Sequence, residues 1–251
     1  MTEIINHNQE EDDDQLGKEA LDPQMSLVDH LQEFRKRLLI AIVAVVVGST
    51  ISYFYASELV QYITAPAGKL YYMSPAEAFF TYLRVSFFTG FLLALPIVLY
   101  QIWAFILPAL SNKERMASFI LVPSSVVLFF LGLAFSYTLV LPAGIRFFMG
   151  FATDNLQPML SLGQYLSFVI SFLLPFGFIF ELPLFIIVMA KLGIISSEFL
   201  TSKRKHLWVL SFVVGAIISP TPDVFSQTMV AVPILVMYEA SRLIVKYILK
   251  K

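Results

Sequence analysis

The sequence contains no cysteine, so disulfide bonds and thiolate metal sites are excluded for this chain. Charged residues are scarce as well: they make up 14% of the 251 residues, whereas a soluble domain carries roughly 25%. The three histidines, at positions 7, 30 and 206, fit no metal-ligand spacing. A glycine-rich phosphate loop and a catalytic dyad are also missing, so we expect neither an enzyme nor a bound cofactor.

What the chain does contain is long charge-free runs, within a composition that is 58% hydrophobic. About 20 apolar residues in a helix cover the ~30 Å hydrocarbon core of a bilayer. Lipid offers the backbone no hydrogen-bond partner, and none of the runs alternates as a barrel strand does, so each run predicts a transmembrane helix. The predicted spans are Leu38–Ser57, Val85–Asn112, Met116–Ile145, Asn155–Phe180, Leu207–Pro222 and Val224–Tyr238.

The predicted fold class is therefore an all-α membrane protein with six transmembrane helices, the last two of them short. Their 16 and 15 charge-free residues make only ~24 and ~22 Å of helix. Local thinning of the bilayer or snorkelling of the flanking Lys205 and Glu239 would each accommodate them. We expect one six-helix domain over residues 25–251, preceded by a disordered acidic tail over residues 1–24.

Lysine and arginine predict the orientation. Fourteen of the 17 basic residues lie before the first span, in the second-to-third loop, in the fourth-to-fifth region or at the C-terminal end. The other three, Lys69, Arg84 and Arg146, lie on the opposite side. By the positive-inside rule, both termini are predicted to be cytoplasmic or stromal.

Several sequence blocks follow one another in a family's order. Residues 26–37 read SLVDHLQEFRKR and predict a helix with one apolar face. The later blocks are SPAEAF (74–79), PIVLYQIWAFILPAL (96–110), KER (113–115), YLSF (165–168), FELP (180–183) and SPTPDVFSQ (219–227). Together they resemble TatC, the large polytopic subunit of the twin-arginine (Sec-independent) protein translocase. The main departure is Phe34, where the family usually has leucine.

The resemblance implies a function and a location. It implies that the chain binds twin-arginine signal peptides at its cytoplasmic face and exports folded proteins using the proton motive force. The implied partners are TatA-type and TatB-type single-span subunits, the signal peptides and membrane lipid, with no nucleic acid, and self-association is left open. The implied location is a bacterial inner membrane or a thylakoid membrane, cyanobacterial or plastid.

Four positions match the family's signal-peptide site: Glu33, Arg35, Phe105 and Glu114. Carboxylates recognise guanidinium groups best, through charge-assisted bidentate hydrogen bonds. The resemblance therefore implies that Glu33 and Glu114 accept hydrogen bonds from the paired arginines. It also implies that Arg35 orients the acidic groups and that Phe105 packs against the apolar part of the peptide.

Glu181 is predicted to lie inside the membrane, because it precedes Lys191 by ten residues, or ~15 Å of helix. An ionisable residue at that depth is costly and functional by default. The resemblance makes it a polar site for cargo or for a partner's transmembrane helix. A protonated, hydrogen-bonded core glutamic acid is the plainer interpretation.

Two rival functions and two auxiliary positions complete the prediction. The alternative function is a secondary transporter of a small solute with Glu181 as its coupling carboxylate, although the chain shows no inverted repeat. A scaffold without transport function would leave Glu181 unexplained. Pro66 and Asp223 also match family positions: Pro66 is expected to shape the first far-side loop, and Asp223 to cap the sixth helix.

Overall fold

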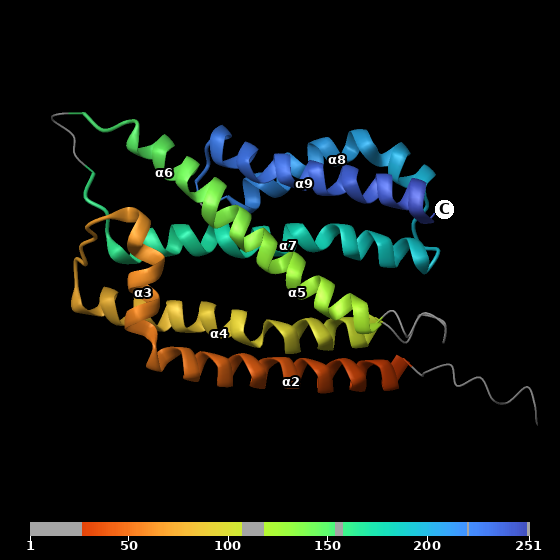
Figure 1. Cartoon of the computed structure of the whole chain (residues 1–251), viewed down its shortest axis with the longest axis horizontal. Helices are drawn as coiled ribbons and strands as arrows, with labels where there is room; N and C mark the ends of the chain where they lie inside the picture. The colour runs from red at the N-terminus through yellow and green to blue at the C-terminus, as the bar shows by residue number, and fades with distance from the viewer. Residues whose placement is uncertain (1–26, 107–117, 154–157, 220, 250–251) are drawn as a thin grey trace, which may run out of the picture. The chain divides into compact units, whose positions relative to one another are not determined.

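The computed structural model describes residues 27–106, 118–153, 158–219 and 221–249. The predicted tail (1–24) and Glu114 lie outside the described residues. The chain divides into two compact units, residues 1–39 and 40–251. In chain order the elements (Figure 1) are α2 (Leu27–Phe54), α3 (Ala56–Thr64), η1 (Ala65–Ala67), α4 (Pro75–Ile106), α5 (Ser118–Phe135), η4 (Ser136–Val140), α6 (Leu141–Met149), α7 (Leu162–Lys191), α8 (Ser197–Ile218), α9 (Val224–Ile244) and η5 (Val245–Leu249).

The structure is helical along almost its whole described length, which confirms the predicted fold class. Five helical stretches have the length and composition to cross a bilayer: Asp29–Phe54, Pro75–Ile106, Ile120–Met149, Leu162–Lys191 and Val224–Leu249. The remaining long helix, α8, carries Glu198 and the run Lys203–Lys205 in its first half, so only its second half is apolar. With 22 and 21 residues, α8 and α9 are shorter than α2, α4 and α7.

Within residues 40–251, α7 is the element on which the others pack. It contacts α4, α5 and α9, while α8 packs on α9 and α3 packs on α4. In Figure 1, α7 runs between α4 and α9, and α5 crosses it obliquely. Leu166, Val169 and Phe176 of α7 are completely buried, as is Phe129 of α5. The apolar core therefore follows the length of α7.

Glycines bring helix backbones into direct contact at two crossings. A Cβ atom on Gly132 of α5 would collide with the carbonyl oxygen of Phe176 on α7 and lie 3.1 Å from the Cα atom of Gly177. Gly48 of α2 and Gly90 of α4 meet in the same way. Small residues allow such close approach between membrane helices, where van der Waals packing replaces the hydrophobic driving force. These crossings hold α2, α4, α5 and α7 at close range.

The structure moves the ends of three predicted spans. The second begins at Pro75 and not at Val85, and the fourth runs over Leu162–Lys191 and not over 155–180. The third continues through η4 and α6 to Met149. A single charged side chain does not end these helices when it has a partner: Arg84 donates a hydrogen bond to Ser167, and Glu181 accepts one from Ser125.

The segment between α2 and α4 folds back on the helices. Residues 56–64 form α3, whose Ala56, Val60 and Ile63 are buried and which packs against α4. Pro66 lies in the short helix η1 that follows, and Gly68 then adopts a φ of 74°. Between α5 and α7, by contrast, residues 141–149 continue the third span as α6.

The glycine crossing of α5 and α7 generates a stability prediction. Gly132→Ala should destabilise the protein by about 1–3 kcal/mol, because its methyl group would overlap the Phe176 carbonyl. Gly144→Ala is the matched control, since there the nearest atom is a ring carbon of Phe168 at 3.4 Å, an ordinary contact. Thermal unfolding in detergent compares the two variants. Equal melting temperatures would contradict the role of the crossing.

Candidate functional site

Glu33 lies in the first part of α2 and is paired within its own helix. Its Oε1 atom accepts hydrogen bonds from Nε and Nη2 of Arg37, at 3.0 and 2.5 Å, one helical turn later. Both side chains are about one quarter exposed. The second oxygen, Oε2, is shielded from solvent and has no hydrogen-bond partner among the described residues. One oxygen of the Glu33 carboxylate is thus hydrogen-bonded to Arg37, and the other has no hydrogen-bond partner among the described residues.

The structure describes two of the other three predicted signal-peptide residues. Arg35 is exposed on α2. Phe105 is half-buried near the C-terminal end of α4, one residue before Ile106. Glu114 lies outside the described residues, so the predicted pairing of two carboxylates stays a prediction. Arg35 and Phe105 belong to different units of the chain, and their joint role in a peptide site stays a prediction.

Glu181 belongs to a hydrogen-bonded chain that joins three helices. The Trp103 Nε1–H group of α4 donates to the Ser125 hydroxyl of α5 at 2.6 Å, and that hydroxyl donates to Glu181 Oε2 of α7 at 2.8 Å. Trp103 and Ser125 are buried, and Glu181 is half-buried. These two hydrogen bonds fix the direction of the Glu181 carboxyl group inside the helical bundle.

The second oxygen of Glu181 is available for another interaction. Oε1 is buried and has no hydrogen-bond partner among the described residues. A buried polar atom without a partner costs ~1–3 kcal/mol of stability, so its retention calls for an explanation beyond packing. This oxygen therefore has hydrogen-bonding capacity that no described residue uses.

Trp103 and Ser125 were not predicted as site residues. A signal for Trp103 exists in hindsight: a buried indole N–H group normally finds an acceptor, and Trp103 lies inside a predicted span. Ser125 carries no such signal, because serine hydroxyls inside helices commonly bond to the carbonyl four residues earlier, as Ser86 does to Tyr82. Only the three-dimensional contact shows that the Ser125 hydroxyl is turned toward Glu181.

At the N-terminal end of α7, hydrogen bonds connect the start of α7 to the start of α4. The Glu77 carboxylate accepts hydrogen bonds from the Ser161 hydroxyl, from the Gly163 N–H group at 2.9 Å and from the Met73 N–H group at 2.7 Å. This carboxylate therefore anchors the start of α7 to the start of α4. Its acceptor capacity is used within the chain, which indicates a structural role.

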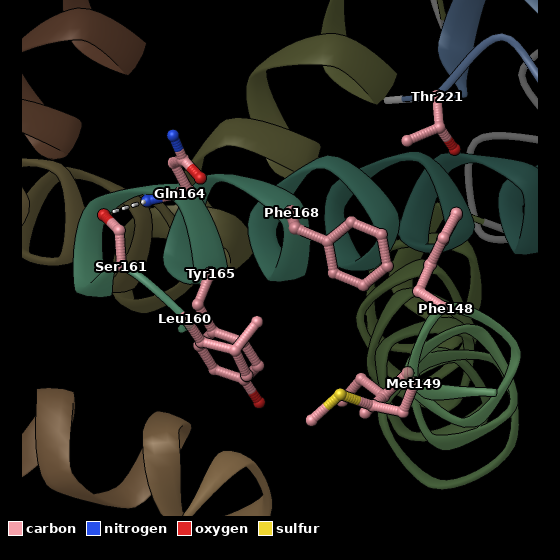
Figure 2. Close-up of a pocket in the computed structure, with 9 residues that line it drawn as sticks. Phe148, Met149, Leu160, Ser161, Gln164, Tyr165, Phe168 and Thr221 are labelled. Carbon is pink, nitrogen blue, oxygen red and sulfur yellow. Dashed lines mark hydrogen bonds between the residues drawn. The ribbon is translucent and has the colours of Figure 1, made fainter. Parts of the chain in front are cut away.

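A small pocket lies beside this end of α7. Figure 2 shows Phe148, Tyr165 and Phe168 around it, together with the hydrogen bond in which Ser161 caps the N–H group of Gln164. Its volume is about 250 Å³, below the ~300–1,000 Å³ of typical ligand sites. None of the predicted site residues lines it. Within the described part of the chain, no three His, Asp or Glu residues gather into a metal site either.

Asp223 caps α9, as its position suggested. Its Oδ1 atom accepts a hydrogen bond from the Ser226 N–H group at 2.8 Å. Burial acts to raise the pKa of Asp223, but hydrogen bonds from Thr221, Ser226 and Phe225 together outweigh it and leave this pKa below its ordinary value. The residue thus stays ionised at the positive end of the α9 dipole.

Comparison with known proteins gives matches along most of the chain. Residues 29–233 match the family described as Sec-independent protein translocase protein (TatC). The TatC protein of Carboxydothermus hydrogenoformans is 40% identical over 234 residues, covering 92% of this chain and 96% of that protein. TatC of Escherichia coli is 37% identical and covers 88% of each chain. A crystal structure of a twin-arginine translocase receptor, TatC, superposes with a TM-score of 0.78 at 40% identity, covering 86% of this chain and 98% of that one.

The cap at Asp223 generates a pH-dependent prediction. Asp223→Ala should cost about 1 kcal/mol of stability at neutral pH, because the Ser226 N–H group loses its acceptor. Since folding lowers this pKa, the contribution is complete above the unfolded value of about 4 and fades as the pH falls through the folded value.

Thermal unfolding at neutral pH and near pH 3 checks this sign. The difference between wild type and Asp223→Ala should shrink in acid. Asp223→Asn is the control, because asparagine caps helices without titrating. A destabilisation by alanine that is the same at both pH values would contradict the ionised cap.

Proposed function

This chain belongs to the TatC family of Sec-independent protein translocase proteins, and we propose that it receives twin-arginine signal peptides for the export of folded proteins. It is a multi-pass integral membrane protein and a transport component. The observation that carries the proposal is the match over 86% of the chain, at 40% identity, to a structure described as a twin-arginine translocase receptor.

The partners and the orientation follow from the family and from the charges. We infer that TatA-type and TatB-type single-span subunits assemble with the chain, that both termini are cytoplasmic or stromal, and that the proton motive force drives transport. The segregation of the basic residues supports this orientation. A relative in Synechocystis, 36% identical, fits either a bacterial inner membrane or a thylakoid membrane.

We propose that Glu33 is one docking point for the signal peptide. Its Oε2 atom has no partner among the described residues, while Oε1 holds Arg37. A guanidinium group of the peptide can bond to Oε2, or displace Arg37 and bond to both oxygens. The second geometry favours arginine over lysine, because only the planar guanidinium presents two parallel N–H donors. Arg37 holds the carboxylate in one orientation until the peptide arrives.

Three further residues complete the proposed peptide site. Glu114, which lies outside the described residues, is proposed to accept hydrogen bonds from the second arginine. Phe105 offers a half-buried aromatic surface for the apolar stretch of the peptide. Arg35 is proposed to orient the acidic groups. Pro66 has no proposed contact with the peptide; its place in η1 supports a role in shaping the far-side loop.

We propose that Glu181 acts later in the cycle than the surface site. Its Oε1 atom is an acceptor inside a transmembrane helix, and Ser125 and Trp103 hold it in one direction. A polar side chain in the transmembrane helix of a small partner subunit, or in the cargo's signal peptide, would supply the missing donor. Such a bond inside the membrane is worth ~1–2 kcal/mol, strong enough to select a partner and weak enough to be released.

A peptide-binding assay tests the docking point. Glu33→Gln and Glu114→Gln should each weaken binding of a twin-arginine peptide by at least about tenfold, because each removes hydrogen bonds between charged groups. Asp29→Asn is the matched control, an acid-to-amide change one turn before Glu33 on the same helix. Crosslinking or anisotropy with the purified complex measures binding.

The ligand provides a second control. A peptide with two lysines in place of the arginines should bind wild type as weakly as the arginine peptide binds Glu33→Gln. Equal binding of both peptides to wild type would overturn the proposed function itself. Undiminished binding by both acid variants would overturn only the residue assignment.

The Glu181 proposal is tested by separating binding from transport. Glu181→Ala and Ser125→Ala should reduce export of a folded twin-arginine precursor, about tenfold for the serine change, while signal-peptide binding stays intact. Ser124→Ala is the control, since it removes a hydroxyl from the preceding position. Small-solute uptake measured in the same cells should not change. A loss of uptake would favour the secondary transporter, and a loss of peptide binding without a loss of export would contradict the assigned role.

A further inference from the structure

A long apolar groove lies between α7, α8 and α9, all within residues 40–251. Its volume is about 590 Å³. Phe178 and Phe185 of α7, Leu207 and Val214 of α8, and Ile234 of α9 are among its lining residues. Several lining residues, among them Phe178, Phe185 and Leu210, are exposed on the outer surface of the helices, so an occupant can enter from the membrane.

Among the described residues that line the groove, Lys203 is the only charged one, and Ser211 and Tyr238 are the only polar ones. The Ser211 hydroxyl donates to the Trp208 carbonyl at 2.8 Å, and the Tyr238 hydroxyl donates to the Leu200 carbonyl at 2.6 Å. An occupant that matches this lining is apolar over its length and anionic at one end.

The charged end of the groove has a positive surplus. Lys203 Nζ lies 6.0 Å from the centre of the Phe199 ring, which also lines the groove. Next to it along α8, Arg204 bonds to Glu239 at 2.6 Å, and Arg242 bonds to the same carboxylate at 2.9 Å. Two guanidinium groups thus share one carboxylate, and the exposed Lys205 adds a further positive charge.

We propose that this groove binds one anionic phospholipid. The acyl chains lie between α7 and α8, and the headgroup phosphate lies at the Lys203 ammonium group. Basic pockets between transmembrane helices are typical sites for anionic headgroups, and each nearby basic residue contributes electrostatic attraction. A zwitterionic headgroup would place a second positive charge against Lys203, and a neutral one would leave the lysine without an anion.

The lipid site is separate from the proposed transport site. Along α7, residues 178, 179, 182, 185 and 186 line the groove, whereas Glu181 bonds to Ser125 on α5. Glu33 belongs to the first unit of the chain and is not among the residues that line the groove. Loss of lipid binding and loss of signal-peptide binding are therefore distinguishable outcomes.

Native mass spectrometry of the full-length chain in detergent tests the proposal. The probes are phosphatidylglycerol and phosphatidylcholine with identical acyl chains. Wild type should bind one phosphatidylglycerol in preference to phosphatidylcholine. Lys203→Gln should lose about fivefold in affinity for phosphatidylglycerol and none for phosphatidylcholine. Lys69→Gln, which removes an exposed lysine outside the groove, should bind as wild type does.

A matched pair of tryptophan variants tests where the acyl chains bind. Val214→Trp fills the groove and should weaken both lipids, whereas Val213→Trp adds the same ring at the neighbouring exposed position and should weaken neither. Thermal unfolding verifies that each variant is folded.

Three outcomes would overturn the lipid site. Equal affinity of wild type for the two lipids would remove the role of Lys203, and equal binding by the two tryptophan variants would place the lipid elsewhere. If Val214→Trp releases a copurifying single-span subunit or a second copy of this chain, and lipid binding does not change, the groove holds a protein helix instead.

Discussion

Lipid supplies neither hydrogen-bond donors nor acceptors, and this constraint governs how the chain folds. The backbone responds by forming long helices. The polar side chains inside the spans respond by finding partners within the protein: Arg84 bonds to Ser167, Glu181 to Ser125, and Ser86 to the carbonyl of Tyr82. Wherever such a partner exists, a helix continues through a charged residue. Within residues 40–251, three buried polar atoms inside the described spans have no hydrogen-bond partner among the described residues: Ser136 Oγ, Tyr165 OH and Glu181 Oε1. Of these three, Glu181 is the one with a carboxyl group, and this makes it a pointer to a function inside the membrane.

α7 combines the structural and functional roles of the fold. One side presents Glu181 to α4 and α5, and another lines the apolar groove shared with α8 and α9. Its Gly177 and the Phe176 carbonyl form the close crossing with Gly132 of α5. Because these features share one helix, a ligand that shifts α7 acts on all of them.

The sequence alone predicted the all-α membrane class, because hydropathy reveals long apolar helices. Glu181 lies within α7, and its depth in the membrane stays a prediction. The predicted helix ends differ from those observed at residues 75, 149 and 162. The predicted spans were limited to charge-free runs, and the sequence does not reveal that Arg84 has a partner on α7. The capping role of Asp223 could be predicted, because a cap depends on residues that are close in sequence. The chain from Trp103 through Ser125 to Glu181 was not, because it depends on contacts between three helices. Glu33 and Glu114 as a peptide-binding pair stay predictions.

The contact between Gly132 and the Phe176 carbonyl has a mechanical consequence. A side chain between two helices can change rotamer and let them slide, but two backbones in direct contact have no such freedom. A rotation of α5 that turned a larger side chain into this crossing would bring it into collision with the α7 backbone, so the close approach depends on Gly132 facing the Phe176 carbonyl.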